Sequence, residues 1–258
     1  MGEVSILRIL KELLKYLSVF FDYFKTNSDK LFGEVSTLKE LSTLEVQNCQ
    51  PGECRVEVLL KHLPFTLQEL NSDHNHLTDH DIIVLAETLQ DLHDLKSLSL
   101  RYNSITGNGL KPLVKALKLH GNFHSLDLSG NPIKENGLQA LGELSNLTAL
   151  KLTYYSNIGD SKVEVLVDAL VSNKNLHSLN LSGNPCIGSE AGLEPLAQLT
   201  NLRHLDISDW PHHNQGIHVD RCEETLNKVL AKLQLLNLCS CRSGHSYPFT
   251  EVLTLQGQ

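Results

Sequence analysis

A nine-residue frame, L-x-x-L-x-L-x-x-N/C, recurs along most of this chain and constrains its fold more than any other feature. Copies of the frame begin at Leu41, Leu67, Leu95, Phe123, Leu147, Leu176, Leu202 and Leu233. Successive copies are 24 to 31 residues apart, and some are imperfect, since Ser72 stands where one copy should carry its third leucine. Self-similarity at a period of roughly 20 to 50 residues indicates a solenoid, because a single repeat cannot bury its apolar face without neighbours.

Each position of the frame has a structural explanation. Successive side chains of a strand point to opposite faces, so the second and third leucines point into the core and the residues between them point out. The ninth position turns the chain away from the strand, where a buried Asn can donate to and accept from backbone groups that the turn leaves unpaired. The sequence places these structural turn residues at Cys49, Asn75, Asn103, Asn131, Asn184 and Cys241.

A stretch with helical periodicity follows each turn. In residues 81–89, 110–117 and 162–170, apolar side chains recur at spacings of three and four, which is typical of a helix with one buried face. Strand followed by helix, at about 28 residues per unit, predicts an α/β fold. We expect a horseshoe-like solenoid of about eight repeats, with parallel strands on the concave face and helices on the convex face.

The frame and its helices resemble leucine-rich repeats of the ribonuclease-inhibitor-like subtype, and in particular the C-terminal repeat region of NOD-like receptors. The resemblance covers roughly residues 38–258. It implies a cytosolic recognition or regulatory module of innate immunity that binds another protein. The nucleotide-binding module of those receptors has no counterpart in the sequence, so the resemblance implies no ATP-driven activity, and a receptor fragment and a stand-alone relative would look the same.

The two ends of the chain differ from its middle. Within residues 1–37, the stretch 4–25 has the pattern of an amphipathic helix, which we interpret as an N-terminal cap because a solenoid's first repeat otherwise exposes its core. The predicted solenoid spans residues 38–241. Residues 242–258 form a C-terminal tail that can supply only a partial cap.

Composition restricts the class of partner. The formal net charge of −8 argues against nucleic-acid and anionic-membrane surfaces, which need clustered Lys and Arg. Charged residues such as Arg8, Lys11 and Lys15 interrupt the apolar N-terminal stretch, so we predict neither a signal peptide nor a transmembrane helix. The six cysteines form no CxxC pair, and we interpret them as reduced thiols of a cytoplasmic protein.

The concave wall is the predicted recognition surface, because frame positions three, five, seven and eight face it. The predicted protein-binding residues are Glu45, Glu69, Asp73, His74, Arg101, Tyr102, Asp127, Lys151, Tyr154, His204, Asp206 and Asp209. Six of these are acidic and two are basic, which favours a partner with a basic surface. Tyrosine and arginine are typical of interface hot spots. The alternative is a sheet face that is merely solvated.

Catalytic and cofactor motifs are absent from the sequence. It contains no Walker-type glycine loop, no G-x-S-x-G, no H-E-x-x-H and no GxGxxG, so we predict neither an enzyme nor a cofactor. Two groups of histidines, one at residues 74–80 and the other at residues 212–218, lack the spacings of zinc ligands, so we predict no metal site.

Two further functions stay open at this point. Ribonuclease inhibitor is similar in repeat type and acidity, and an acidic wall suits inhibition of a basic enzyme, although this chain has about half the repeats. A GTPase-activating protein of the Ran activator type shares the repeat and uses an arginine from a repeat loop. Arg101 is the candidate for that role, but the acidic tail typical of that family is missing.

Overall fold

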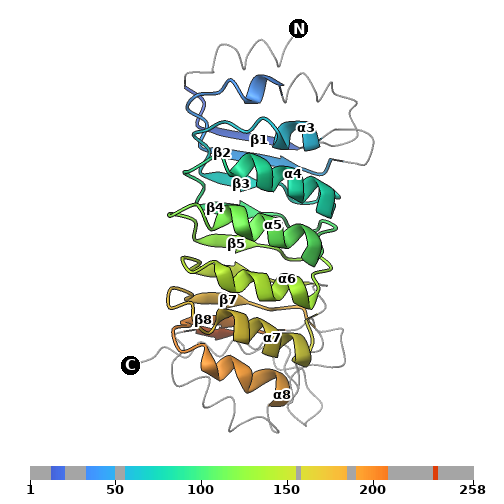
Figure 1. Ribbon diagram of the computed structural model, residues 1–258, viewed down its shortest axis with the longest axis vertical. Coiled ribbons are helices and arrows are strands. Elements are labelled where there is room, and N and C mark those ends of the chain that lie inside the picture. Colours follow the sequence, from blue (N-terminus) through green and yellow to red (C-terminus); the bar gives the residue numbers. More distant parts are fainter. Residues whose placement is uncertain are drawn as a thin grey trace. The chain divides into compact units, whose positions relative to one another are not determined.

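The computed structural model describes residues 13–20, 33–49, 56–154, 158–184, 190–208 and 235–237. The chain divides into two compact units, residues 1–127 and 128–258, and each unit repeats a pattern of strand, turn and helix (Figure 1). This division falls inside the stretch predicted as one solenoid. The boundaries at residues 37/38 and 241/242 stay predictions.

In the first unit, five parallel strands form a sheet in chain order. They are β1 (Tyr16–Phe20), β2 (Thr43–Gln47), β3 (Glu69–Asn71), β4 (Ser97–Ser99) and β5 (Ser125–Asp127). Among the described residues of this unit, the helices are α3 (Val56–Leu60), α4 (Asp79–Leu89) and α5 (Gly107–Leu117). Glu69 pairs with Ser97, and Ser97 pairs with Ser125, so the third frame position of each copy lies beside that of the next.

The second unit continues the same pattern with four strands. They are β6 (Ala149–Lys151), β7 (Ser178–Asn180), β8 (His204–Asp206) and β9 (Leu235–Asn237), paired in parallel in that order. The helical elements in the described part of this unit are α6 (Glu135–Ala140), η1 (Leu141–Glu143), α7 (Asp160–Leu170), α8 (Glu190–Leu193) and η2 (Pro195–Gln198). Each of the eight predicted frame copies therefore supplies one strand, β2 to β9, and the predicted α/β repeat fold is confirmed.

Strand β1 corrects the prediction of a helix over residues 4–25 at residues 16–20, whereas residues 4–12 and 21–25 lie outside the described residues. Tyr16 pairs in parallel with Thr43, and both the Ser42 and the Thr43 amides donate to the Lys15 carbonyl, at 2.9 and 3.0 Å. The sequence carries the reason, because Leu14, Leu17 and Val19 occupy the three apolar positions of a further frame copy, 27 residues before the copy at Leu41. A local helical pattern is a weak preference, and pairing with a neighbouring strand outweighs it.

The core of each unit combines the frame's leucines with apolar side chains of the helices, such as Leu85, Leu113 and Leu166. The second and third leucines of the clearest copies are at most 1% exposed; they are Leu98, Leu100, Leu126, Leu128, Leu179 and Leu181. Burying one such side chain contributes about 1.5–3 kcal/mol, so the repeated frame supplies a large part of the driving force for folding. Among the described helices, none combines the length and the apolarity that crossing a membrane requires.

Candidate functional site

The strands present the predicted alternation of buried and accessible side chains. In β2, β4, β5 and β7 the fourth frame position is buried, while the third and fifth are partly exposed. We call the surface formed by frame positions three, five, seven and eight of each unit its strand face. Helices cover the opposite side of the strands, so this face is the one that each sheet leaves open to solvent (Figure 1).

The eighth frame position has a backbone conformation that the sequence analysis missed. Six copies have a positive φ there, between 47° and 70°: Asn48, His74, Tyr102, Gly130, Tyr154 and Gly183. Glycine and asparagine tolerate this left-handed region, whereas for most other residues it costs on the order of 1–2 kcal/mol. The two glycines at this position were the available signal. His74, Tyr102 and Tyr154 therefore hold aromatic side chains at positions where backbone strain favours glycine.

In the first unit, the eighth position carries a stack of two rings. The His74 and Tyr102 rings lie with centroids 4.4 Å apart and planes 22° from parallel. The Arg101 guanidinium carbon is 5.4 Å from the centre of the Tyr102 ring, and Arg101 Nε is 3.8 Å from the Asp127 carboxylate. We call His74, Arg101, Tyr102 and Asp127 the Tyr102 cluster. Stacking and a cation–π contact fix these side chains in place before any partner arrives.

Asp73 does not belong to the accessible surface, which corrects its place in the predicted site. The residue is 6% exposed, and its Oδ1 accepts hydrogen bonds from the Ser99 hydroxyl at 2.7 Å and the Arg101 amide at 2.8 Å. Burial raises the pKa of the Asp73 carboxyl, against the lowering effect of these hydrogen bonds. Its donors lie in the following repeat, so no local pattern could reveal them. Asp73 positions the backbone that carries the Tyr102 cluster.

Glu45 on β2 and Glu69 on β3 precede the residues of this cluster in the sequence. Glu45 Oε2 accepts hydrogen bonds from the Tyr16 hydroxyl at 2.9 Å and the Ser18 hydroxyl at 3.1 Å. Tyr16 is 53% exposed and lies on β1, so the missed strand adds an aromatic residue to the strand face. Glu69 is exposed. No contact that we describe brings either glutamate into the Tyr102 cluster.

The second unit has its own eighth-position contact. A Cβ added to Gly183 would lie 2.6 Å from Cδ1 of Tyr154, so the Tyr154 ring packs directly over the glycine of the next repeat. Lys151 and His204 are exposed. Asp206 is partly buried, and its Oδ1 accepts from the Ser208 amide at 3.0 Å and the Ser208 hydroxyl at 2.7 Å. Asp209, the last predicted binding residue, lies outside the described residues.

Buried asparagines link successive turns of the first unit. Asn75 Oδ1 accepts from the Cys49 amide at 2.9 Å, and its Nδ2 donates to the Val46 carbonyl at 2.6 Å. One repeat later, Asn103 Oδ1 accepts from the amides of Asn75 and Leu77, at 3.1 and 2.9 Å. Each side chain thus joins its own turn to the preceding one, which fixes the backbone that presents the eighth position.

Buried asparagines also hydrogen-bond the turns of the second unit. Asn131 Nδ2 donates to the Leu128 carbonyl at 2.9 Å. Asn184 Nδ2 donates to the Leu152 and Leu181 carbonyls, each at 2.7 Å. Cys241, the last predicted turn residue, lies outside the described residues.

Cys49 corrects the prediction that all six cysteines are reduced. It occupies the ninth frame position, is 2% exposed and is disulfide-bonded. A disulfide depends on two thiols meeting in space with the right geometry, which the spacing of cysteines along a repeat sequence does not reveal. Over the part of the chain that the structure describes, no group of three or more His, Cys, Asp or Glu side chains is placed to hold a metal ion.

Comparison with known proteins bears on the fold. Residues 91–114, 122–142 and 172–197 match the family model described as Leucine Rich repeat. No curated protein sequence matches the chain. Among solved structures, the chain is similar to an internalin (inlF) from Listeria monocytogenes, with 20% identity and a TM-score of 0.52 over 91% of this chain and 56% of that one. Internalin C2 from the same bacterium is similar at 27% identity, with a TM-score of 0.38 over 62% of this chain and 64% of that one.

The likeness to the first internalin agrees with the architecture described above. The chain spans about 56% of the length of the first internalin, and at this identity the likeness concerns the fold alone. Each segment matched by the repeat model contains one frame copy, beginning at Leu95, Phe123 or Leu176. Leucine-rich repeats are in general protein-binding modules, and nothing described above supplies catalytic chemistry. The frame, the strand register and the matched segments together make this chain an α/β leucine-rich-repeat solenoid.

Proposed function

We propose that this chain is a non-catalytic recognition module that binds a partner protein on its strand face, with the Tyr102 cluster as the anchor. The observation that carries the proposal is the stack of His74 on Tyr102 at left-handed backbone positions. Strained conformations of this kind persist only where the surrounding structure enforces them, and they concentrate at functional sites. Here the buried asparagines and Asp73 enforce the backbone.

The cluster has the properties of an interface hot spot. Tyr102 and Arg101 are partly exposed, and both belong to the residue types that dominate binding energy in alanine scans. Their stacking and ion-pair contacts hold them in one arrangement, which reduces the entropy lost on binding. A partner that covers the Tyr102 ring would remove water from the contacts of Arg101 with the ring and with Asp127, and thereby strengthen both.

The charge of the strand face supports a partner with a basic surface. In the first unit, Glu45 and Glu69 outnumber the basic residue Arg101, which Asp127 already faces at 3.8 Å. The burial of Asp73 removes one acid from the predicted surface, but the accessible balance stays negative. Complementary charge would direct the encounter and raise the association rate at low salt.

The finer assignment, to a recognition module like that of NOD-like receptors, rests on the sequence resemblance. Three helices of eleven residues, α4, α5 and α7, support the helical, ribonuclease-inhibitor-like form of the repeat. The cytoplasmic location is part of the same proposal, and the disulfide at Cys49 weighs against it, because the cytosol keeps thiols reduced. A GTPase-activating role has less support, because Arg101 is held by Tyr102 and Asp127 instead of extending free.

Site-specific photo-crosslinking of the full chain tests the proposal. A benzophenone amino acid is placed at Tyr102 in one version and at Glu164, an exposed residue of α7, in a matched version. We expect a discrete protein adduct from position 102. Unlabelled chain added as a competitor should suppress this adduct, and unlabelled chain with Tyr102→Ala should suppress it at least tenfold less well. Equal adducts from both positions, or equal suppression by the two competitors, would contradict the assignment.

A further inference from the structure

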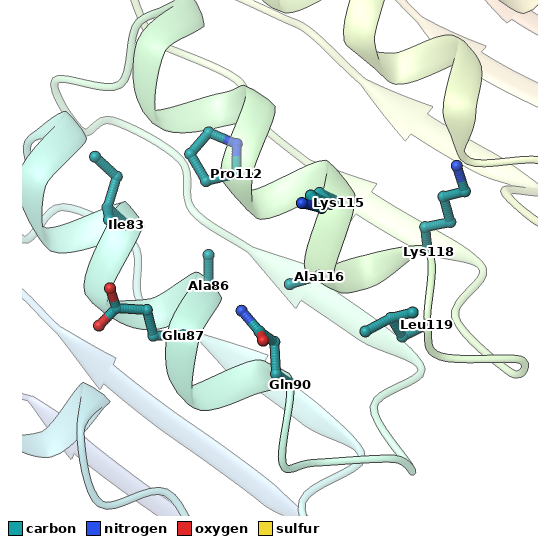
Figure 2. Close-up of a pocket in the computed structure, with 9 residues that line it drawn as sticks. All are labelled: Ile83, Ala86, Glu87, Gln90, Pro112, Lys115, Ala116, Lys118 and Leu119. Atoms are coloured by element: carbon teal, nitrogen blue, oxygen red, sulfur yellow. The ribbon is translucent and has the colours of Figure 1, made fainter.

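The helix side of the first unit carries a groove that the proposed function does not use. A hollow of about 450 Å³ lies between α4 and α5, and Figure 2 shows its lining side chains projecting from these two neighbouring helices. Ala86 and Ala116 form its floor, and both are 2% exposed. Small side chains at the floor allow another element to approach closely. The hollow is therefore open, shallow and apolar at its centre.

Two large apolar side chains at the groove remain accessible to water. Ile83 on α4 is 36% exposed, and Leu119, just beyond the end of α5, is 63% exposed. Both line the hollow, one toward each of its ends (Figure 2). Together with Pro112 they make an apolar rim around the alanine floor. An element laid in the groove would bury these side chains at a gain of about 25 cal/mol per Å² of apolar surface.

The charge of the two walls is opposite. Helix α5 contains Lys111 and Lys115 and no acidic residue, and Lys115 lines the groove. Glu87 on α4 lines the other wall. Helix α7, with the same buried pattern, carries Glu164 and Asp168 where α5 carries its lysines. In a chain of net charge −8, this basic edge is therefore a local feature and not a property of the repeat.

We propose that this groove is a second docking surface, which takes an amphipathic helix of a partner protein that is acidic along one edge. The apolar stripe of that helix rests on Ala86 and Ala116, and its acidic edge runs along Lys115 and Lys118, the two lysines that line the groove. Residues 83 to 90 span about 10 Å of α4, which matches two turns of a partner helix and anchors spaced at i, i+3 or i+4, and i+7. Glu87 on the opposite wall repels acidic side chains, so the acidic edge of the partner helix must face the lysines. This preference sets the direction in which the partner helix binds.

This inference goes beyond the proposed function, because the groove lies on the helix side and involves no residue of the Tyr102 cluster. The probe is a fluorescein-labelled helical peptide of roughly 16 residues, long enough to be appreciably helical in isolation. It carries a leucine stripe, glutamates along one edge and glutamines elsewhere. A second peptide has lysine in place of each glutamate. Fluorescence anisotropy with the full chain gives the dissociation constants.

We expect the glutamate peptide to bind saturably and the double variant Lys115→Glu/Lys118→Glu to weaken it at least tenfold. The same variant should bind the lysine peptide more tightly than the unmodified chain does. Leu119→Ser should weaken the glutamate peptide several-fold. Lys174→Glu, which makes the same charge change per lysine at an exposed site outside the groove, should leave binding unchanged.

Several results would overturn the proposal. They are failure of the glutamate peptide to saturate, equal binding to the Lys115→Glu/Lys118→Glu variant, and an equal loss with Lys174→Glu. Loss of binding with Tyr102→Ala, but not with the groove variants, would assign the peptide to the strand face instead. Tyr102→Ala tests only the strand face, and the lysine variants test only the groove. Failure of the groove proposal therefore leaves the proposed function intact, and failure of the proposed function leaves the groove proposal intact. Circular dichroism of each variant confirms that these exposed substitutions preserve the fold.

Discussion

Asn103 offers the most direct test of how the repeats are held together. Its side chain is 7% exposed, and its Oδ1 accepts hydrogen bonds from two backbone amides of the preceding repeat, those of Asn75 at 3.1 Å and Leu77 at 2.9 Å. Its Nδ2 donates to the carbonyls of Ser72 and Leu100, each at 3.0 Å. Asn103→Ala removes all of these interactions at once and leaves the two backbone amides without their acceptor.

The expected loss follows from the groups that the substitution leaves unpaired. An orphaned buried amide costs about 1–3 kcal/mol, and the substitution orphans two of them. The two carbonyls lose one donor each, which adds less because a carbonyl oxygen has a second lone pair. We therefore expect the free energy of unfolding to fall by roughly 2–5 kcal/mol. That is a large part of the 5–15 kcal/mol that ordinarily stabilises a domain.

Urea unfolding at 25 °C, followed by circular dichroism at 222 nm, measures this loss. Asn122→Ala, at an exposed asparagine of the following loop, is the matched control and should change the free energy of unfolding by less than about 0.5 kcal/mol. Hydrogen exchange should show faster exchange at the amides of Asn75 and Leu77 in the Asn103→Ala protein. A loss below about 1 kcal/mol, with both amides still protected, would refute this account of the turn.

Three further predictions concern single residues. Gly183→Ala introduces a Cβ at φ +69° and 2.6 Å from Tyr154, so thermal unfolding should show destabilisation by roughly 1–3 kcal/mol; combining it with Tyr154→Ala should recover part of the loss, and strict additivity would contradict the contact. Burial lowers the pKa of His120 below 6.5, so the folded state binds fewer protons there than the unfolded state; stability should be fully present above pH 6.5 and fall as the pH drops toward the folded pKa. His120→Asn introduces the residue type of Asn173, whose side chain donates to the Leu144 and Leu147 carbonyls. This substitution should flatten the pH dependence of stability, and an unchanged slope would exclude His120 as its source. Cys49 should resist alkylation in the denatured, unreduced protein and react after reduction, whereas reaction without reductant would show a free thiol.

The eighth frame position illustrates how a repeat converts structural positions into recognition. Gly130 and Gly183 occupy it at little conformational cost, and Asn48 at a small one. Tyr102 and Tyr154 raise the conformational cost of this position. Packing of the ring offsets the cost in both cases, on His74 for Tyr102 and on Gly183 for Tyr154. Repeats without this packing would be expected to return to glycine or asparagine.

The sequence by itself determined the repeat, its strands and its turns. The leucine frame has a period of two across each strand. When the strand pairs in register, this periodicity predicts which of its side chains are buried. The described strands β2 to β8 accordingly carry a buried fourth position, and Asn103, Asn131 and Asn184 at the ninth position each donate to the carbonyl three residues earlier in their own turn. These features depend on residues close in sequence, which is why pattern alone predicts them.

The tertiary structure decided what depends on groups about 26 to 31 residues apart. Pairing with β2 made Tyr16–Phe20 a strand in spite of the local helical pattern. Donors in the next repeat buried the Asp73 carboxylate, and stacking between repeats placed His74 on Tyr102. The α4–α5 groove likewise exists only where two repeats meet. A periodic sequence states which side of each repeat a residue occupies, but only the packing of one repeat on the next decides which side chains meet there.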